Sequence, residues 1–534
     1  MADTDDLPGE ASAPEPRFVA LKEGALILGL QFLLLAFRLG EIPLLGPDEP
    51  RYARVAVEMA RANEFVTPTL AGEPWLEKPP LYYWLAGLGF RLFGENEKAA
   101  RWPAALAALL MTGFTGLVGA RLFGRSCGRL AMIVAATSPL LFAYGRAATM
   151  DVLVAAFITG ASGLFILSNL GIAGPSAAPA AWGLMAIAVL AKGPIGILIP
   201  LGVAALSGLA VGRLNLSRLL SPLGIVLALA IAGPWFAAIY LDQGFHFIEV
   251  FILNHNLERF TSTIHNHPGP IYYYLPVLLL GVFPWSGLLA PAIAGLGAVE
   301  RRPLLAILAW ILVPFALFSL AGSKLPGYIL PCLPPFAIVI ALSARVLQSP
   351  EHRGAVRTAG LFGLVISAAV AALAIRGMRQ GEPWGRSALT PALWLLATTF
   401  MASRALDRAR HEGLRILAIG ASGFLLLLTL VAPPVLEAME SGRRLFLPAQ
   451  GREVLVVGAW RTAWMSGYFY NNGRVREMPS LSAALDLVSG QPRLMLFGPS
   501  EWREAKSREG YAALELAQGP RGNVLARIST RSSH

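Results

Sequence analysis

The amino-acid sequence predicts an all-α polytopic membrane protein of about 13 transmembrane helices with a small α/β domain at its C-terminal end. Three observations predict this class. Of the 534 residues, 55% are hydrophobic and 14% are charged, whereas a soluble globular chain has about 25% charged residues. The mean hydropathy is +0.57. Apolar runs of roughly 20 residues, the length that crosses a bilayer, recur along most of the chain.

Thirteen apolar segments are predicted as membrane spans. A further segment, LYYWLAGLGFRLF (81–93), is apolar but short, so we expect a re-entrant or interfacial helix there. The predicted spans are 22–39, 103–123, 128–147, 149–171, 178–191, 193–211, 218–241, 272–298, 303–321, 328–348, 357–376, 389–404 and 413–433.

The distribution of lysine and arginine predicts a cytoplasmic N-terminus, because basic residues accumulate in cytoplasmic loops. One short outer loop, RGMRQGEPWGR (376–386), is basic and opposes this orientation. An odd number of spans then places the C-terminal domain on the outer face of the membrane. The basic connections that support the orientation are 121–129, 212–218, 300–303, 351–357 and 406–415.

The composition also divides the chain into domains. The acidic, Pro-rich residues 1–20 are predicted as a disordered cytoplasmic tail, 21–433 as the transmembrane domain and 434–534 as a domain on the outer face. In that last domain, REVLVVGAW and PRLMLFGPS are typical of buried strands. SLSAALDLVSG and SEWREAKSREGYAALELAQG are typical of helices. The outer loops with candidate functional residues are 41–102, 242–271 and 322–328.

The formal net charge of +11 is explained by these basic cytoplasmic loops. Nucleic-acid binding is not expected, since no basic stripe with interleaved aromatic residues stands clear of the membrane. Cys127 and Cys332 are far apart and form no CxxC pattern, so neither a disulfide framework nor a thiolate metal site is indicated.

Five polar clusters fall on the outer side at the same depth. Scattered, each would be unremarkable, but their convergence on one face indicates a functional site. They are GPDEPRYARVAVEMARANEFVTPTLAGEPWLEKPPLYYW (46–84), Asp151 after YGRAATM, Lys192 in LAKGPIG, the loop FILNHNLERFTSTIHNHPGPIYYY (251–274) and the hairpin GSKLPGY (322–328).

The first of these clusters is predicted to contain a helix on the membrane surface. Tyr52, Val55, Ala56 and Met59 recur at i, i+3, i+4 and i+7, which is one apolar helix face. Asp48, with proline two residues later, fits the N-terminal cap of that helix. The spacing alone does not decide between this cap and a functional carboxylate.

The charged residues of the five clusters are predicted to line a pocket at the outer membrane interface. Cations beside apolar surface suit a ligand with a phosphate head and an apolar tail. Nearby carboxylates suit acid–base chemistry, sugar hydroxyls or a divalent ion. The structural alternatives are a solvated Glu77–Lys78 ion pair and lysines that snorkel to the interface. The cations are Arg51, Lys78, Lys192, Arg259 and Lys324, and the carboxylates are Asp48, Glu77 and Asp151.

Three of the seven histidines, His255, His265 and His267, lie in the 251–274 loop. None of them shows the i, i+4 spacing of a helical zinc pair, and HNH in a loop is more often a hydrogen-bonding feature. A single histidine together with Glu77 would still bind a divalent metal.

These motifs, in this order, resemble the integral-membrane (GT-C type) glycosyltransferases that use polyprenyl-phosphate sugars. The chain is most similar to the bacterial lipid A aminoarabinose transferases and to the related protein mannosyltransferases. The resemblance covers residues 46 to about 335 and is architectural beyond them. The matching pieces are PDEPRYARVAVEMARANEFVTPTLAGEPWLEKPPLYYW, GRAATMDVLV, LAKGPIGILIP, HNLERF, PGPIYYYLPVLLLGVFPW and GSKLPGYILPCLPP.

The resemblance implies a function and roles for single residues. A sugar, with aminoarabinose as the candidate, moves with inversion from undecaprenyl phosphate to lipid A or another envelope acceptor at the periplasmic face. Asp48 and Asp151 match the catalytic acidic positions, and Tyr328 matches a tyrosine at the donor phosphate. The other expected substrate contacts are Arg51, Tyr52, Glu77, Lys78, Lys192, Arg259 and Lys324.

The resemblance also bears on cofactors. Glu77 and His255 are the expected contacts of a divalent metal, zinc or another. No nucleotide is expected, in agreement with the lack of a P-loop or GxGxxG fingerprint. The alternatives are a lipid-phosphate-sugar-dependent hexosyltransferase acting on protein or glycan and, outside the enzymes, a transporter of a lipid-linked sugar. A transporter would place charges near mid-membrane and show internal repeats.

Overall fold

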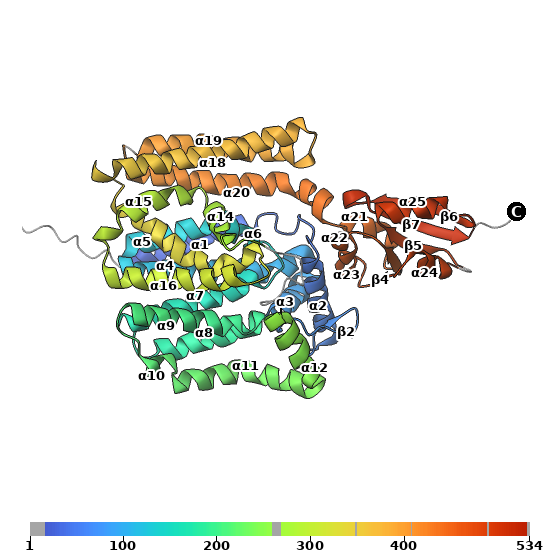
Figure 1. Ribbon diagram of the computed structural model, residues 1–534, viewed down its shortest axis with the longest axis horizontal. Helices are drawn as coiled ribbons and strands as arrows, with labels where there is room; N and C mark the ends of the chain where they lie inside the picture. The colour runs from blue at the N-terminus through green and yellow to red at the C-terminus, as the bar shows by residue number, and fades with distance from the viewer. Residues whose placement is uncertain (1–16, 259–268, 348–349, 407, 489–490, 531–534) are drawn as a thin grey trace, which may run out of the picture.

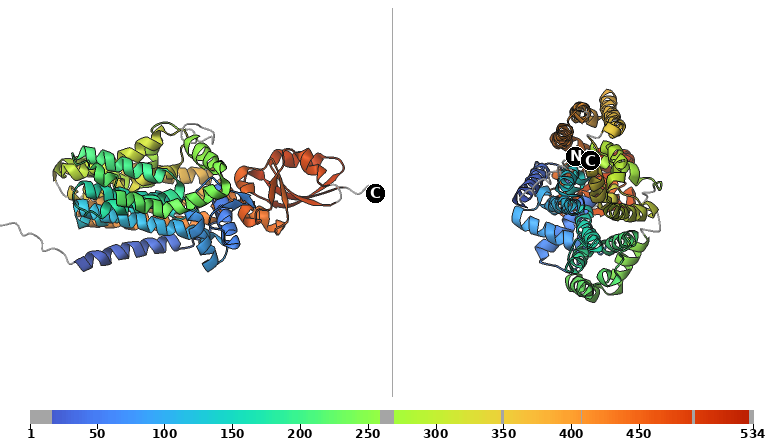
Figure 2. Two further views of the ribbon diagram at one scale, coloured as in Figure 1. Left: turned by 90° about the horizontal axis from the view of Figure 1, so that it is seen from below. Right: turned by 90° about the vertical axis from the view of Figure 1, so that its left-hand side faces the viewer.

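The protein is a long helical bundle with a small domain at one end (Figure 1). Figure 2 shows the same bundle from two further sides, with the C-terminal domain beyond the end where the first loop lies. Residues 1–16 of the predicted tail and Arg259 lie outside the described part of the chain. The computed structural model describes residues 17–258, 269–347, 350–406, 408–488 and 491–530.

Every segment that was predicted as a span is helical over most of its length. The helices of the bundle are α1 (Arg17–Ala36), α4 (Glu97–Phe123), α5 (Arg125–Ala136), α6 (Pro139–Gly145), α7 (Asp151–Asn169), α8 (Ala177–Lys192), α9 (Ile195–Ala210), α11 (Pro222–Gln243), α14 (Tyr274–Gly281), α15 (Leu289–Ala294), α16 (Arg301–Leu320), α17 (Leu333–Leu342), α18 (Arg353–Arg379), α19 (Pro383–Leu406) and α20 (Arg410–Glu440).

The chain is a multi-pass membrane protein, but the predicted count of about 13 spans is not confirmed. Within the described residues, seven helices are long and apolar enough to cross a bilayer, or nine if two bent pairs each count as one span. Those pairs, α5 with α6 and α14 with the helical segment Trp285–Ala294, bend by 59° and 105°. Helices α8 and α9 have 16 residues each, which gives about 24 Å against a hydrocarbon core of roughly 30 Å.

The first loop contains the predicted surface helix, α2 (Asp48–Ala62), and the apolar face read from the sequence is buried. Behind it, α3 (Leu81–Phe93) is the short apolar segment that was not expected to span, and it packs against α2. Strands β1 (Thr69–Leu70) and β2 (Glu73–Pro74) form a small hairpin between these helices. The carboxylate of Glu58 on α2 accepts hydrogen bonds from Thr69 Oγ1 and from the backbone of Ala71 and Gly72, at 2.8–3.2 Å, which fixes the hairpin to the helix.

The C-terminal domain (443–530) is an α/β unit, as predicted. Its sheet has the order β4–β3–β5–β7–β6, in which β4, β3 and β5 are parallel and β7 and β6 are antiparallel. The predicted strand segments contain β3 and β5, and the predicted helical segments contain α24 and α25. The elements are α21 (Arg443–Phe446), β3 (Val454–Val457), α22 (Arg461–Met465), α23 (Gly467–Tyr470), β4 (Val475–Glu477), α24 (Leu481–Asp486), β5 (Arg493–Phe497), α25 (Pro499–Ser507), β6 (Tyr511–Gln518) and β7 (Val524–Thr530).

The helix predicted over YAALELAQ (511–518) is wrong, because this segment is strand β6. Alanine, leucine and glutamate favour a helix only weakly, by tenths of a kcal/mol per residue. Backbone pairing with β7 along the whole segment outweighs that preference. The segment that was predicted as one helix therefore contains two elements, helix α25 and strand β6.

Candidate active site

Five of the predicted site residues line one cavity at the end of the bundle that faces the C-terminal domain. The cavity holds about 780 Å³ of empty space, part of it open to solvent. Its walls come from the first loop, the ends of α7 and α8, the π-helical segment η1 (Ile248–Glu258) and the 3-10 segment η4 (Pro326–Cys332). The predicted residues among its lining are Lys78, Asp151, Lys192, His255 and Tyr328.

Lys192 and Asp151 form an ion pair in this cavity although they are 41 residues apart in the chain. Asp151 is in the first turn of α7, where a carboxylate is favoured by the helix dipole. Lys192 is the last residue of α8, which ends at Gly193 with φ +100°, a conformation that glycine adopts without strain. The ammonium also lies 4.6 Å from the ring centroid of Tyr328. Lys192 therefore faces the cavity, in agreement with the tight Gly-Pro connection after it, which argued against snorkelling.

Lys78 is a second cation of the cavity, and unlike Lys192 it is buried. Only 7% of the residue is exposed, and its Nζ donates a 3.0 Å hydrogen bond to the carbonyl oxygen of Glu77. The solvated Glu77–Lys78 ion pair is therefore wrong, because the lysine is buried and contacts the backbone of Glu77. The remaining lining is mostly apolar and includes Val154, Ile158 and Phe318. A cationic end beside an apolar wall fits a phosphate joined to a hydrocarbon chain.

Asp48, Arg51 and Tyr52 form a second cluster at the start of α2, outside the lining of the cavity. Asp48 is not the N-terminal cap: Pro47 has that position and no side chain caps the helix. The Asp48 carboxylate instead pairs with Arg51 and keeps 43% of its side chain exposed. The Arg51 guanidinium donates 2.9 Å to the Pro47 carbonyl and lies 5.2 Å from the ring of Trp75.

Burial and charge shift two pKa values in this second cluster. Burial lowers the pKa of Arg51, but the negative charge of Asp48 acts against burial and the pKa is raised overall. Burial and the Asp48 charge both raise the pKa of Tyr52 well above its usual value. Arg51 is therefore a permanent cation and Tyr52 a neutral hydroxyl, which leaves Asp48 as the exposed ionisable group of the cluster.

Glu77 connects the two clusters. One of its carboxylate oxygens lies 3.6 Å from Nε2 of His255 in the cavity wall, and its charge also raises the pKa of Arg51. The predicted metal contacts are thus brought together. Two donors are only part of a zinc site, which has three or four protein ligands, and the described residues contain no group of three or more His, Cys, Asp or Glu that would hold a metal.

Two predicted residues remain, Lys324 and Arg259. Lys324 is buried beside the cavity, and its Nζ donates 2.6 Å to the carbonyl oxygen of Ala321. Arg259, like His265 and His267, falls outside the described residues.

A buried ion pair that the sequence prediction missed supports the first loop. Glu49 and Arg101 are 5% and 1% exposed and lie 2.6 Å apart. The other Glu49 oxygen accepts 2.9 Å from the backbone N–H of Ala148, just before α7, and Arg101 donates to carbonyls of the first loop, including Pro43 at 2.7 Å. The available signal was an arginine next to a predicted span, where snorkelling is the common interpretation.

We expect Arg101→Met to destabilise the protein by about 3–5 kcal/mol, because it leaves the buried carboxylate of Glu49 without its partner. Thermal unfolding in detergent measures this loss. The Arg101→Met/Glu49→Leu double variant should recover much of it, since no buried charge remains. An unchanged melting temperature in the single variant would contradict the structural role of the pair.

Comparisons with known proteins agree with this architecture. Residues 77–237 match the family model of dolichyl-phosphate-mannose-protein mannosyltransferases. Undecaprenyl phosphate-alpha-4-amino-4-deoxy-L-arabinose arabinosyl transferases are similar over a longer region. The relative from Edwardsiella ictaluri is 32% identical over 64% of this chain and 62% of its own length. The relative from Aeromonas salmonicida is 33% identical over 65% of each chain. The matched region thus spans a little under two thirds of these relatives.

Solved structures show the same fold over nearly the whole chain. ArnT from Cupriavidus metallidurans bound to undecaprenyl phosphate superposes with a TM-score of 0.76 at 22% identity, covering 96% of this chain and 98% of that one. An oligosaccharyltransferase from Archaeoglobus fulgidus in its apo form is more distant, with a TM-score of 0.52 and 13% identity, covering 97% of this chain and 75% of that one.

The chain therefore has the fold of ArnT and, more distantly, of the archaeal oligosaccharyltransferase. Its sequence is similar to the arabinosyl transferases over about two thirds of the chain.

Proposed function

We propose that this protein transfers a sugar from undecaprenyl phosphate to an envelope acceptor at the periplasmic face of the bacterial inner membrane. The proposal includes a cytoplasmic N-terminus and a periplasmic C-terminal domain. The observation that carries it is the cavity that joins Lys78, Lys192 and Asp151 beside an apolar wall. The names of the related arabinosyl transferases support undecaprenyl phosphate as the carrier and aminoarabinose as the sugar.

The two lysines suit the leaving group of this reaction. When the glycosidic bond breaks, its electron pair goes to the phosphate oxygen, and negative charge develops on polyprenyl phosphate. Fixed cations at that point stabilise the transition state more than the ground state, which accelerates the reaction. The apolar wall at Val154, Ile158 and Phe318 suits the first part of the hydrocarbon chain.

The acceptor oxygen attacks the sugar carbon from the side opposite the phosphate, so a single displacement inverts that carbon. If the acceptor is a hydroxyl, its proton passes to a carboxylate, and Asp48 is the exposed carboxylate of the site. If the acceptor is a phosphate of lipid A, its oxygen is already anionic, and Asp48 then orients the acceptor or the donor sugar. A covalent glycosyl-enzyme would give retention and would contradict the single displacement.

The acceptor we propose is lipid A. Purified protein in detergent would be incubated with undecaprenyl-phosphate aminoarabinose and lipid A, and the product analysed by mass spectrometry. A gain of one aminoarabinose mass per transfer is expected. A sugar gain on protein or another glycan, with lipid A unchanged, would favour the hexosyltransferase alternative. Movement of the donor across a liposome membrane without transfer would favour the transporter.

A divalent metal at Glu77 and His255 stays part of the proposal and has its own test. Two described donors suggest weak retention, so we expect less than one equivalent of zinc in protein purified without added metal, by elemental analysis. Glu77→Gln should lower any zinc bound on titration relative to Glu41→Gln, a change at an exposed carboxylate outside the site. Tight stoichiometric zinc that survives Glu77→Gln would contradict this placement.

A further inference from the structure

The backbone just before α2 is held by residues from the far end of the chain. Leu44, which is fully buried, donates its N–H to the hydroxyl oxygen of Tyr470 at 2.8 Å. Two residues on, the N–H of Gly46 donates 3.2 Å to the carbonyl oxygen of Glu440, the last residue of α20. Between them, the N–H of Leu45 donates 2.9 Å to Glu49. Two of these three consecutive amides are thus fixed by residues that follow in the chain about 400 positions later.

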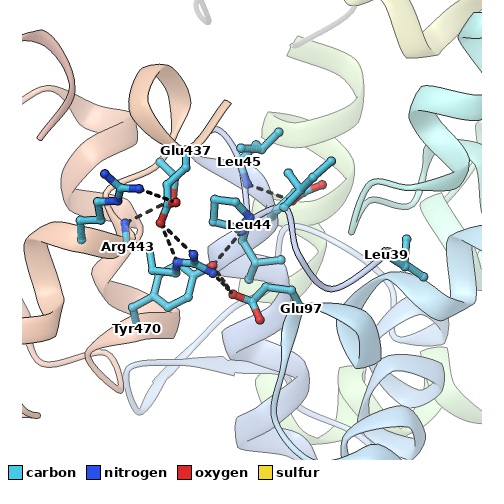
Figure 3. Close-up of polar contacts among 12 residues, drawn as sticks. Leu39, Leu44, Leu45, Glu97, Glu437, Arg443 and Tyr470 are labelled. Atoms are coloured by element: carbon cyan, nitrogen blue, oxygen red, sulfur yellow. Dashed lines mark hydrogen bonds and ion pairs between the residues drawn. The ribbon is translucent and has the colours of Figure 1, made fainter. Parts of the chain in front are cut away.

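Tyr470 also donates its own proton to a fixed acceptor. Its hydroxyl lies 2.9 Å from the carboxylate of Glu97, at the start of α4. The same carboxylate oxygen lies 3.3 Å from Arg443, whose guanidinium pairs with Glu437 at 2.8 Å. Figure 3 shows Tyr470 between Leu44 and Glu97, with Arg443 and Glu437 beside it. Burial, followed by the Glu97 charge, raises the pKa of Tyr470, so the hydroxyl keeps the proton that it donates.

Further contacts join the C-terminal domain to α2. Arg54 of α2 donates 3.3 Å to the side-chain oxygen of Asn472. A Cβ added at Gly473, which has φ +76°, would lie 3.4 Å from Ala71 of the first-loop hairpin, so the two backbones are in close contact. Burial raises the pKa of Tyr468, and the positive charge of nearby Arg51 partly offsets this increase.

We propose that Tyr470 of the C-terminal domain is a positioning residue: its hydroxyl joins the backbone of Leu44 to Glu97 and so fixes the turn that presents Asp48 and Arg51. The turn from Leu44 to Pro47, just before α2, has only four residues and includes Gly46 at φ +63°, so it has no rigid element of its own. Glycine allows many conformations there, and the Tyr470 contact selects one. This inference rests on the proposed function for its effect on catalysis, but not for its effect on the loop.

Tyr470→Phe is the variant that tests the inference, because it removes one oxygen atom and keeps the ring that packs on Phe469 at 5.3 Å. Tyr511→Phe is the matched control, since it makes the same change on β6 of the same domain. Two measurements apply to both variants in the full-length protein. The first is hydrogen exchange of the segment that contains Leu44 and Leu45, and the second is transfer from undecaprenyl-phosphate aminoarabinose.

Tyr470→Phe should speed exchange in that segment by tenfold or more, as for a buried amide that loses its partner. It should lower kcat about tenfold with the donor KM unchanged, as expected for a misplaced catalytic group. Tyr511→Phe should change neither. A purely structural role would instead lower the melting temperature and leave kcat per folded molecule unchanged.

The two measurements separate this inference from the proposed function. Unchanged exchange in Tyr470→Phe would overturn the positioning role. Faster exchange in Tyr470→Phe, with a kcat within twofold of that of Tyr511→Phe, would show that Tyr470 holds the turn but that the turn does not set the catalytic geometry. That result would also overturn the positioning role. If exchange is faster in Tyr470→Phe but the wild-type protein transfers no sugar, the contact between Tyr470 and the loop stands and the proposed transferase function is refuted.

Discussion

The Asp48→Asn variant is expected to transfer sugar about 10²–10⁴-fold more slowly than the wild type, while the protein stays folded and inserted in the membrane. That is the range by which a positioned proton acceptor accelerates a reaction. Asparagine has nearly the same shape and still accepts a hydrogen bond from Arg51, but it does not take up a proton. Transfer onto a hydroxyl acceptor would therefore suffer most.

A matched control for Asp48 lies in the same loop. Glu41 is also paired with an arginine three residues away, Arg38, and it is 50% exposed at the side chain. Glu41→Gln should thus remove a similar carboxylate from a similar ion pair and leave transfer within twofold. Near-normal turnover in Asp48→Asn would show that this carboxylate only neutralises Arg51. A loss confined to hydroxyl acceptors, with phosphate acceptors unaffected, would identify Asp48 as the base.

Replacement of Lys192 by methionine is expected to reduce transfer about 10²–10³-fold, which is the effect of removing one fixed donor from a developing negative charge. Methionine keeps the length of the side chain but removes the ammonium that pairs with Asp151 and faces Tyr328. The measurement is kcat with saturating donor. Lys98→Met is the control, because Lys98 is an exposed lysine on α4 that does not line the cavity.

The loss in Lys192→Met has two possible sources, and a double variant separates them. The single change leaves the Asp151 carboxylate in the cavity wall without its cation, which costs stability as well as activity. Lys192→Met/Asp151→Asn removes both charges and should restore the melting temperature. If transfer recovers along with stability, Lys192 is a structural partner of Asp151 and not a phosphate-binding cation.

The sequence predicted those parts of this site that depend on residues close together in the chain. The apolar spacing from Tyr52 to Met59 predicted α2, and Gly-Pro after Lys192 predicted a tight connection between two helices. The convergence of five polar clusters was predicted by topology alone, since every second connection between spans lies on the same side of the membrane. The pairing of Lys192 with Asp151 was not predicted, because it depends on how α7 packs against α8 and α9.

Other features were mispredicted or missed because distant parts of the chain decide them. The sequence pattern around Asp48 suits a helix cap. Asp48 is instead the first residue of α2, and its carboxylate pairs with Arg51. The helical composition of YAALELAQ is overridden by pairing with β7. The Glu49–Arg101 pair joins segments 52 residues apart, and its burial depends on α4 packing beside the first loop.

The hydrogen bonds of Leu44 and Gly46 have a consequence for how the protein is made. Leu44 and Tyr470 are 426 positions apart, so the ribosome has synthesised nearly the whole chain before this contact forms. Contacts of such long sequence separation form late and slowly. The first loop leaves the insertion machinery early. The turn before Asp48 stays without these two hydrogen bonds until α20 is inserted and the C-terminal domain has folded. A chain that stops short of this domain would cross the membrane many times and still lack the contact that fixes the turn before Asp48.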